Sequence, residues 1–233
     1  MKYTHTTPRK WTEQELRILQ ESLDCGLPLS EIASKLNRSE TSVHLKRKRL
    51  GKDNRTYNDK HRTQKYEANL AYLQELKPKS VLDLYAGPKS YYRGLVDTVV
   101  SNDLVYEGHD YKDEAKYVLA KIFANRERYD VVDLDPFGSA YDCFELAVQV
   151  ARKGLVITFG ELGHRRWKRT DYTKRTYRIH DPDNLNLTSL SAYVDEVARR
   201  YKKRAVVYRS CDWNNIGRVY YFLEDLPKQL PRI

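Results

Sequence analysis

Apolar residues in the first fifty positions recur at helical spacing in three short segments. Leu16 and Leu19 lie on one face of a predicted helix, and Thr12 and Glu15 form a capping box at its start. A second short helix is predicted from about residue 30. A third, from about residue 40, carries Val43 on its inner side and basic residues elsewhere. The pattern predicts a small three-helix unit.

Beyond residue 65, short apolar runs alternate with amphipathic stretches, which is typical of an α/β domain. Helices are predicted at about 67–76, 118–122, 144–150 and 191–201. Buried parallel strands are predicted at about 80–84, 98–102, 131–134 and 155–159. Two further apolar runs, at 205–209 and 218–222, predict the last strands.

Two carboxylates interrupt the apolar run near residue 132. Asp133 lies within it and Asp135 directly after it, and a Pro-Phe-Gly turn then ends the strand. A charge in this position is costly unless it has a function. Because ligands of open α/β sheets bind outside the carboxyl ends of the strands, Asp135 is a candidate for the reacting site. The alternative interpretation is that Asp135 caps a helix that begins near Ser139.

A turn of small residues follows the first predicted strand. The segment from Asp83 through Tyr85 to Gly87 is expected to open a helix near Tyr91, and the second strand ends at Asp103. A glycine turn followed by an acid after the next strand typically holds a nucleoside cofactor, with the acid on the ribose hydroxyls. The sequence therefore predicts a nucleoside-cofactor site at this turn.

The charge of the chain favours a polyanionic partner. Its formal net charge is +10, and it contains 19 tyrosines. Residues 1–64 hold 14 Lys and Arg against 8 Asp and Glu, so the smaller part is the more basic per residue. Nucleic acid is the expected partner. The alternative is a basic protein whose lysines are merely solvated.

Cysteine usage and hydropathy exclude several classes of protein. Cys25, Cys143 and Cys211 are far apart and have no histidine at ligand spacing, so neither a disulfide framework nor a metal site is predicted. No apolar run approaches 18 residues, and no signal peptide is recognised at the start of the chain. We expect a cytoplasmic protein without membrane association; the sequence does not indicate an oligomeric state.

A second basic segment lies late in the chain, at residues 164–178. It holds seven basic residues and one acid, interleaved with three aromatic residues. Cations for phosphates beside aromatic faces for bases are what a nucleic-acid clamp requires. The candidate contact residues are Arg165, Arg166, Trp167, Lys168 and Arg169. The alternative is a solvated loop.

Residues 8–52 resemble the Myb/SANT-like helix-turn-helix family. The resemblance rests on Trp11-Thr12-x-x-Glu15, on Leu29-Ser30-Glu31-Ile32-Ala33 and on the segment from Ser39 to Gly51. It implies a DNA-binding domain over 1–52. The stretch that follows has no apolar periodicity, which predicts a linker over 53–65 before a second domain over 66–233. It also implies contacts to bases or phosphates from the third helix, through His44, Lys46, Arg47 and Arg49. A helical protein-interaction module is the alternative.

Three motifs in the larger part resemble class I S-adenosylmethionine-dependent methyltransferases. They are Val-Leu-Asp-Leu-Tyr-Ala-Gly at 81–87, Ser-Asn-Asp at 101–103 and Asp-Leu-Asp-Pro-Phe-Gly-Ser at 133–139, and the last is most similar to the tRNA guanine-N2 methyltransferases. The resemblance implies a Rossmann-like sheet closed by an antiparallel hairpin, with S-adenosylmethionine as cofactor. It assigns Asp83, Tyr85 and Gly87 to the methionine end of the cofactor, Asp103 to the ribose, and Asp135, Pro136 and Phe137 to the target base. We also expect Asp133 to contribute to the cofactor site.

The chain departs from that family in two places. Lys89 stands where a second glycine is usual, which predicts weaker or rearranged cofactor binding. Only six residues separate Asp103 from Asp110, too few for a crossover helix, so the third strand is expected to be short or missing. Asp110 and Asp113 are the candidates for the adenine-side acid, and Asp113 is also a natural helix cap.

The combined interpretation is a methyltransferase acting on an exocyclic amino group of a nucleic-acid base. DNA is the substrate expected first, because of the helix-turn-helix resemblance. The alternative is methylation of guanine N2 in tRNA or other RNA, because of the resemblance of the third motif. A third interpretation, prompted by Lys89, is a DNA-binding regulator whose larger domain has lost catalysis.

Overall fold

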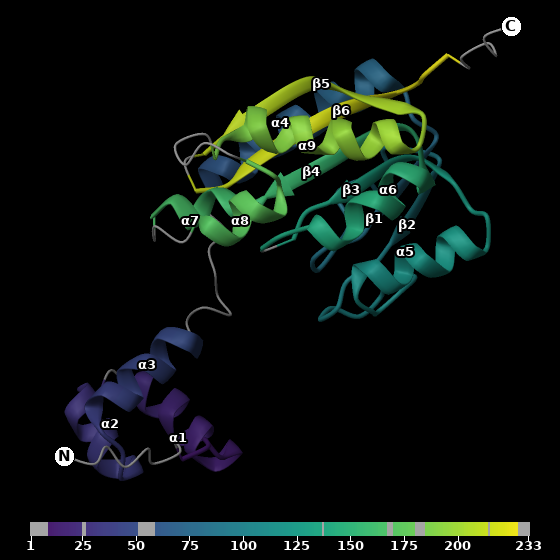
Figure 1. Cartoon of the computed structure of the whole chain (residues 1–233). Coiled ribbons are helices and arrows are strands. Elements are labelled where there is room, and N and C mark those ends of the chain that lie inside the picture. The colour runs from purple at the N-terminus through teal and green to yellow at the C-terminus, as the bar shows by residue number, and fades with distance from the viewer. Residues whose placement is uncertain are drawn as a thin grey trace, which may run out of the picture. The chain divides into compact units, whose positions relative to one another are not determined.

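The computed structural model describes residues 9–24, 27–50, 59–136, 138–166, 170–179, 185–213 and 215–227. The chain divides into two compact units, at residues 1–59 and 60–233 (Figure 1). Each unit has its own hydrophobic core, and each is treated separately below.

The first unit is built from three short helices, as the apolar pattern predicts. They are α1 (Glu13–Asp24), α2 (Leu29–Leu36) and α3 (Glu40–Leu50). Leu19 from α1, Ile32 and Leu36 from α2, and Val43 from α3 are buried against one another. Ser39 Oγ accepts a hydrogen bond from the Ser42 N–H (3.2 Å), which caps α3 as expected.

Glu15 links the start of α1 to the turn after α2. The predicted capping box is present: the Glu15 N–H donates to Thr12 Oγ1 (3.2 Å), and the Thr12 N–H donates to Glu15 Oε2 (2.9 Å). Arg38 donates to both oxygens of Glu15, at 3.0 Å from Nε and 2.9 Å from Nη2, and its guanidinium lies over the Trp11 ring at 4.2 Å from the centroid. These hydrogen bonds lower the pKa of Glu15 to about 2.

The second unit begins with a helix that is longer than the sequence suggests. We expected a linker over residues 53–65, but α4 spans Asp59–Leu76. The first turns of α4 contain few apolar residues, so hydrophobic periodicity does not reveal them. Residues 53–58 of the expected linker lie outside the described residues.

Six strands form one mixed sheet in the order β2-β1-β3-β4-β6-β5. The first four, β1 (Ser80–Asp83), β2 (Thr98–Ser101), β3 (Tyr129–Leu134) and β4 (Ala151–Phe159), pair in parallel. The last two, β5 (Lys203–Asp212) and β6 (Gly217–Asp225), form an antiparallel hairpin, with β6 beside β4. The α/β class and the closing hairpin are confirmed.

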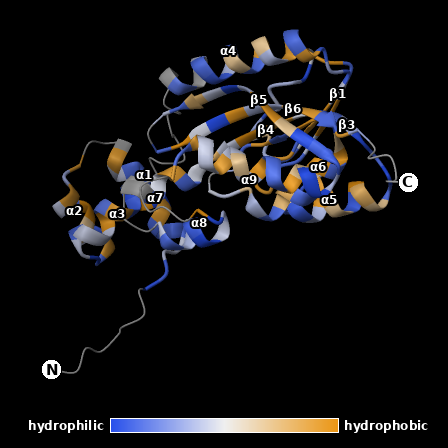
Figure 2. Cartoon of the chain, turned by 45° about the horizontal axis from the view of Figure 1, so that its top comes forward, coloured by the Kyte–Doolittle hydropathy of each residue, from blue (hydrophilic) through white to orange (hydrophobic). Residues whose placement is uncertain are grey.

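Helices cover both faces of the sheet (Figure 2). On one face lie α5 (Ala115–Ala124), α6 (Phe144–Val150) and α9 (Leu187–Arg200), packed on a large apolar core. On the other face α4 packs through Ala68, Tyr72 and Leu73. Close packing there depends on Gly154 in β4, because a Cβ at this position would lie 1.8 Å from the Tyr72 hydroxyl.

The face under α4 changes from apolar to polar along the strands. Val81, Val131 and Val156 are buried in the apolar part. Two residues further along each strand the side chains are Asp83, Asp133 and Thr158, all buried. The carboxyl ends of three neighbouring strands therefore form a buried polar layer beneath the first half of α4.

The connection between β1 and β2 corrects one expectation. No helix opens near Tyr91: the described chain between the two strands consists of turns and a single bridge between Arg93 and Val96. Two side chains of this segment reach the polar layer instead: Ser90 Oγ donates to Asp83 (2.6 Å), and the Tyr92 hydroxyl donates to Asp133. Pro88 and Gly94 also oppose a helix here.

The prediction that the third strand is short or missing is confirmed in the described residues. After β2 the chain makes only an isolated parallel bridge, between Asn102 and Tyr111, before α5. Asp113 precedes Glu114, which is the N-cap residue of α5, so Asp113 is not the cap. A helix beginning at Ser139 is likewise absent, since that residue is followed by the 3₁₀ turn η1 (Tyr141–Cys143).

The segment after β4 is more helical than expected. A 3₁₀ turn, η2 (Gly160–Leu162), leads into α7 (Gly163–Arg166), and α8 (Asp171–Thr176) follows. Among the described residues, no helix is long and apolar enough to cross a bilayer. No cluster of three or more His, Cys, Asp or Glu side chains arranged for a metal ion occurs in the same part of the chain.

Candidate active site

The strand order reverses between β1 and β3, which creates the point where ligands of such sheets bind. From β1 the chain runs outward to β2, then returns to β3 on the other side of β1. At a reversal of this kind the loops after the two strands diverge and leave a crevice at their carboxyl ends. Asp83 and Asp133 are register partners there, and Asp135 follows directly after β3.

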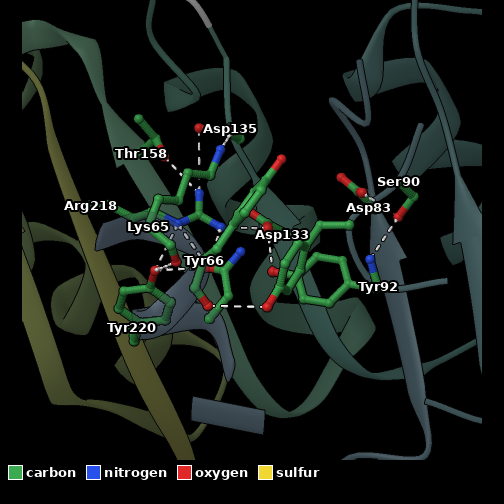
Figure 3. Close-up of polar contacts among 12 residues, drawn as sticks. Lys65, Tyr66, Asp83, Ser90, Tyr92, Asp133, Asp135, Thr158, Arg218 and Tyr220 are labelled. Carbon is green, nitrogen blue, oxygen red and sulfur yellow. Dashed lines mark hydrogen bonds and ion pairs between the residues drawn. The ribbon is translucent and has the colours of Figure 1, made fainter. Parts of the chain in front are cut away.

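Asp135 is held between two cations. Lys65 from α4 makes an ion pair with Asp135 Oδ2, and Arg218 Nη1 from β6 lies 3.4 Å from Asp135 Oδ1. Figure 3 shows these side chains converging at the carboxyl end of β3. Burial alone raises the pKa of Asp135, but Lys65, Arg218 and the Thr158 hydroxyl outweigh it, and the net pKa lies below its ordinary value. The carboxyl group is therefore ionised at neutral pH.

Arg218 is the centre of the polar layer. Its side chain is 0% exposed, and Nη2 donates to Asp133 Oδ2 at 2.6 Å. The same guanidinium donates to Thr158 Oγ1 (2.7 Å) and to Asn69 Oδ1 of α4 (3.2 Å). A buried arginine is tolerated only when its donors and charge are matched in this way.

Lys65 and Arg218 were not predicted from the sequence. Lys65 was assigned to the linker, although Lys65, Asn69 and Tyr72 are spaced to share one face of a helix. Arg218 shares a strand face with Tyr220, which is a buried position. Because β6 runs antiparallel to β4, the start of β6 lies beside the carboxyl end of β4 and hence at the site. The position of Arg218 at the start of the second strand of the predicted hairpin could therefore have indicated that it lies at the site.

Asp83 lies deeper in the same layer. It is buried and receives a hydrogen bond from Ser90 Oγ. Burial and the negative charge of Asp133 raise the pKa of Asp83 to about 7. One further oxygen in the layer, Asp133 Oδ1, is buried without a hydrogen-bond partner among the described residues. Asp83 and Asp133 are therefore both buried inside the larger unit.

A cavity of about 190 Å³ opens where the chain leaves the carboxyl ends of β1 and β2. Such a volume is below the roughly 300–1,000 Å³ of most drug-sized ligand sites, so it accommodates one end of a larger molecule. Its walls come from the ends of β1 and β2, the start of α5 and the segment after Asp135. They are Leu84, Tyr85, Asn102, Leu104, Asp113, Glu114, Ala115, Lys116, Ser139, Asp142 and Cys143.

The expected cofactor residues occupy different positions around this cavity. Tyr85 lines it, whereas Asp83 and Asp133 lie in the polar layer. Gly87 adopts a φ of +65°, with open space where a Cβ would stand, and its N–H donates to Asp103 Oδ2 (2.9 Å). Asp103 Oδ1 accepts two more backbone N–H groups, from the residues at 105 and 106. The glycine turn and the acid are thus joined as one rigid loop.

Asp110 does not reach the cavity wall. Its carboxylate accepts hydrogen bonds from the Ser101 N–H (2.8 Å) and hydroxyl (3.0 Å) and anchors the short connection after β2. These hydrogen bonds and Arg93 outweigh partial burial and lower its pKa. Asp113 does line the cavity. Lys89 is exposed and is not part of the wall.

Several predicted positions lie partly or wholly outside the described residues. Pro136 is buried after β3, but Phe137 is not described. His44 and Arg47 are exposed on α3, and Lys46 lies 5.8 Å from the centroid of the Trp11 ring. The Arg49, Arg165 and Arg166 side chains are not described. Neither are residues 167–169, which contain the expected Trp167, Lys168 and Arg169.

No family model matches the chain, and no curated protein matches it. Among solved structures, the chain is similar to Trm1 from Pyrococcus horikoshii with S-adenosyl-L-methionine, at 20% identity over 70% of this chain, with a TM-score of 0.55. The larger unit has a methyltransferase fold. An O-methyltransferase from Bacillus cereus in complex with SAH is another match, at 14% identity over 92% of both chains, with a TM-score of 0.44. This chain spans about half (54%) of the length of the Trm1 protein.

Proposed function

We propose that the protein transfers a methyl group from S-adenosylmethionine to an exocyclic amino group of a nucleic-acid base. The observation that carries the proposal is the position of Asp135. This ionised carboxylate opens the Asp-Pro-Phe-Gly segment at the strand-order reversal of a methyltransferase fold. Ser139, four residues further along the chain, lines the cavity, which supplies space for a second ligand.

The residues around the cavity are compatible with S-adenosylmethionine. The open space at Gly87 allows a ligand to approach the backbone, and the cavity wall is largely formed by the ends of β1 and β2 and the start of α5. Asp103 accepts three backbone N–H groups, and a carboxylate has about four acceptor sites, so one remains for a ribose hydroxyl. Asp103 would hold the ribose, and Tyr85, Leu104 and Asp113 would enclose the nucleoside.

The cofactor supplies an electrophilic methyl group on a sulfonium. The amine nitrogen forms the new N–CH₃ bond while the S–CH₃ bond breaks and its electron pair returns to sulfur. An exocyclic amine is a poor nucleophile because its lone pair is delocalised into the base. Asp135 and the Pro136 carbonyl would each accept an N–H of the amine, which keeps electron density on nitrogen and stabilises the positive charge that develops there. The N-methylated intermediate is strongly acidic and passes its extra proton to the Asp135 carboxylate.

DNA is the substrate that we propose first. The three-helix unit carries an exposed basic surface on α3, with His44 and Arg47 accessible, and it resembles helix-turn-helix domains. A target base inside a duplex would have to be turned out of the stack to reach Asp135. RNA is the second candidate, because the motif at 133–139 resembles the tRNA guanine-N2 methyltransferases.

A single comparison separates these substrates. The full chain is incubated with radiolabelled S-adenosylmethionine and equal molar amounts of duplex DNA and tRNA, and the labelled nucleosides are then identified by mass spectrometry. Label on an amino group of a DNA base supports the first proposal, and label only in tRNA supports the second. Calorimetry with S-adenosylhomocysteine provides the further control. A protein that binds neither this molecule nor S-adenosylmethionine is not a methyltransferase, and the regulator interpretation then replaces both.

A further inference from the structure

Lys65 occupies the side of Asp135 that faces away from the buried core. The Arg218 side chain on the other side is completely enclosed, whereas the Lys65 and Asp135 side chains are 24% and 23% exposed. Arg218, which lies near Asp135 Oδ1, is buried together with Thr158, and Lys65 pairs with Oδ2. An amine that reaches the carboxylate from outside therefore meets Lys65 first.

We propose that the Lys65 ammonium is a place-holder for the amino group of the substrate and that the substrate binds by displacing it. This inference rests on the proposed function. Both groups are nitrogens that donate N–H to a carboxylate oxygen, so both require the same position against Asp135 Oδ2. Substrate binding is then an exchange at this oxygen, in which one nitrogen donor replaces another.

The charges of the site explain why a cation should leave when the substrate enters. Asp133 and Asp135 are balanced by Arg218 and Lys65 in the free protein. When a neutral amine replaces Lys65, Arg218, at 3.4 Å, is the cation that remains beside Asp135. A second positive charge near the carboxylate would then be favourable. That positive charge develops on the amine nitrogen when it attacks the methyl group, because the sulfonium becomes neutral as its S–CH₃ bond breaks. The vacated position is therefore more complementary to the transition state than to the bound substrate.

The two cations differ in whether they can move. Arg218 is fixed by Asp133, Thr158 and Asn69, and its planar guanidinium cannot leave without exposing these partners. Lys65 has a flexible side chain with a compact ammonium. The Lys65 backbone has contacts of its own, since it lies within α4 and its carbonyl accepts a hydrogen bond from the Tyr220 hydroxyl (3.4 Å). The Lys65 side chain can swing away while α4 stays in place.

The chain offers a matched control at the opposite end of β3. Lys153 pairs with Asp130 at 2.9 Å, and this Asp130 carboxylate lies at the start of the strand that ends next to Asp135. Lys153→Met also removes a lysine–aspartate ion pair. This pair lies at the start of β3, whereas the site is at the carboxyl ends of the strands. Any effect of lost charge or lost stability alone should be similar in both variants.

The test compares the wild type, Lys65→Met, Lys65→Arg and Lys153→Met in steady-state methyl transfer to the nucleic acid that the wild type modifies. We expect Lys65→Met to lower the KM for the nucleic acid by roughly two- to fivefold, the range that corresponds to a partly exposed ion pair. Lys65→Arg should retain the competition, and Lys153→Met should leave KM unchanged. A KM that is unchanged or raised in Lys65→Met overturns the inference and assigns Lys65 to ordinary substrate attraction.

A second measurement does not depend on activity. Thermal unfolding of Lys65→Met, Asp135→Asn and the double variant gives the coupling between the two side chains in the free protein. Non-additive effects support the place-holder, and additive effects contradict it even when the wild type is active. If no nucleic acid is methylated by the wild type, the proposed function fails instead, whatever the coupling.

Discussion

Thr158 and Arg218 lie directly opposite each other across the β4–β6 pairing, and Arg218 Nη1 donates to Thr158 Oγ1 over 2.7 Å. This hydrogen bond joins the closing hairpin to the parallel part of the sheet at the candidate active site. The same guanidinium pairs with Asp133 and Asp135, so the hairpin supplies a buried cation to both acids.

Arg218→Met should lower the free energy of unfolding by about 3–5 kcal/mol, because it leaves two carboxylates without their buried cation. Denaturant unfolding measures this change. Arg209→Met, in the neighbouring strand β5 and exposed, is the control and should change stability by less than about 0.5 kcal/mol. Equal effects of the two substitutions would contradict the central role of Arg218.

Asp135→Ala should reduce the rate of methyl transfer by about 100-fold or more, since it removes the group that stabilises the charge developing on the amine. The Kd for nucleic acid should stay nearly unchanged, because phosphate contacts elsewhere dominate affinity. Single-turnover kinetics and filter binding give the two quantities. Asp130→Asn, at the other end of β3, is the matched control. Wild-type turnover in Asp135→Ala would refute the role given to this carboxylate.

The Asp83 carboxyl should make stability depend on pH near neutrality. Its pKa in the folded protein is about 7, above the ordinary value of 3.8, so the folded state binds a proton that the unfolded state has released. The free energy of unfolding should therefore fall as pH rises from about 4 to about 7 and then level off. Subtracting the pH profile of Asp83→Asn from that of the wild type isolates this effect. A difference that does not vary with pH would show that Asp83 is ionised throughout.

The basic surface of α3 should determine the salt dependence of nucleic-acid binding. Replacing both Lys46 and Arg47 with alanine should weaken binding and reduce the slope of log K against log salt by about 0.9 for each phosphate that the protein no longer neutralises. Lys35→Ala is the control, because Lys35 is exposed on α2. Titrations at several salt concentrations measure the slope. If it does not change, the three-helix unit is better described as a protein-interaction module.

Asp103→Ala should weaken binding of S-adenosylhomocysteine by about tenfold or more, as it removes the proposed ribose acceptor and releases the Gly87 N–H. Calorimetry measures the Kd directly. Asp97→Ala, on the exposed turn before β2, serves as the control. Unchanged affinity in Asp103→Ala would move the ribose to another acid, with Asp113 of the cavity wall as the next candidate.

The parts of the fold that sequence predicts well are those where burial follows a regular period. The strands around Val131 and Val156 and the helices around Leu19 and Val118 are recognised in this way. The short or missing third strand follows from a different signal, the six residues between Asp103 and Asp110. Local spacing is enough for these features. The fold class follows from them.

The missed features are polar and depend on interactions between distant segments. Lys65 and Asn69 of α4 face the sheet, and because both are polar, hydrophobic periodicity does not reveal this face of the helix. The helix expected near Tyr91 is absent because Ser90 and Tyr92 bind Asp83 and Asp133, acids that lie in two different strands. Arg218 meets Asp133 from 85 residues away. Only the assembled sheet brings these groups together.

The long helix α4 also decides where the larger unit can be cut from the chain. Residue 66, the boundary that hydrophobic periodicity suggests, lies inside α4. A fragment starting there lacks Lys65 and Gln64, so Asp135 loses a cation and the Trp213 indole loses its acceptor. A fragment starting at Asp59 or earlier keeps both. Soluble expression and melting temperature of the two fragments should therefore differ, although their first residues are only about two helical turns apart.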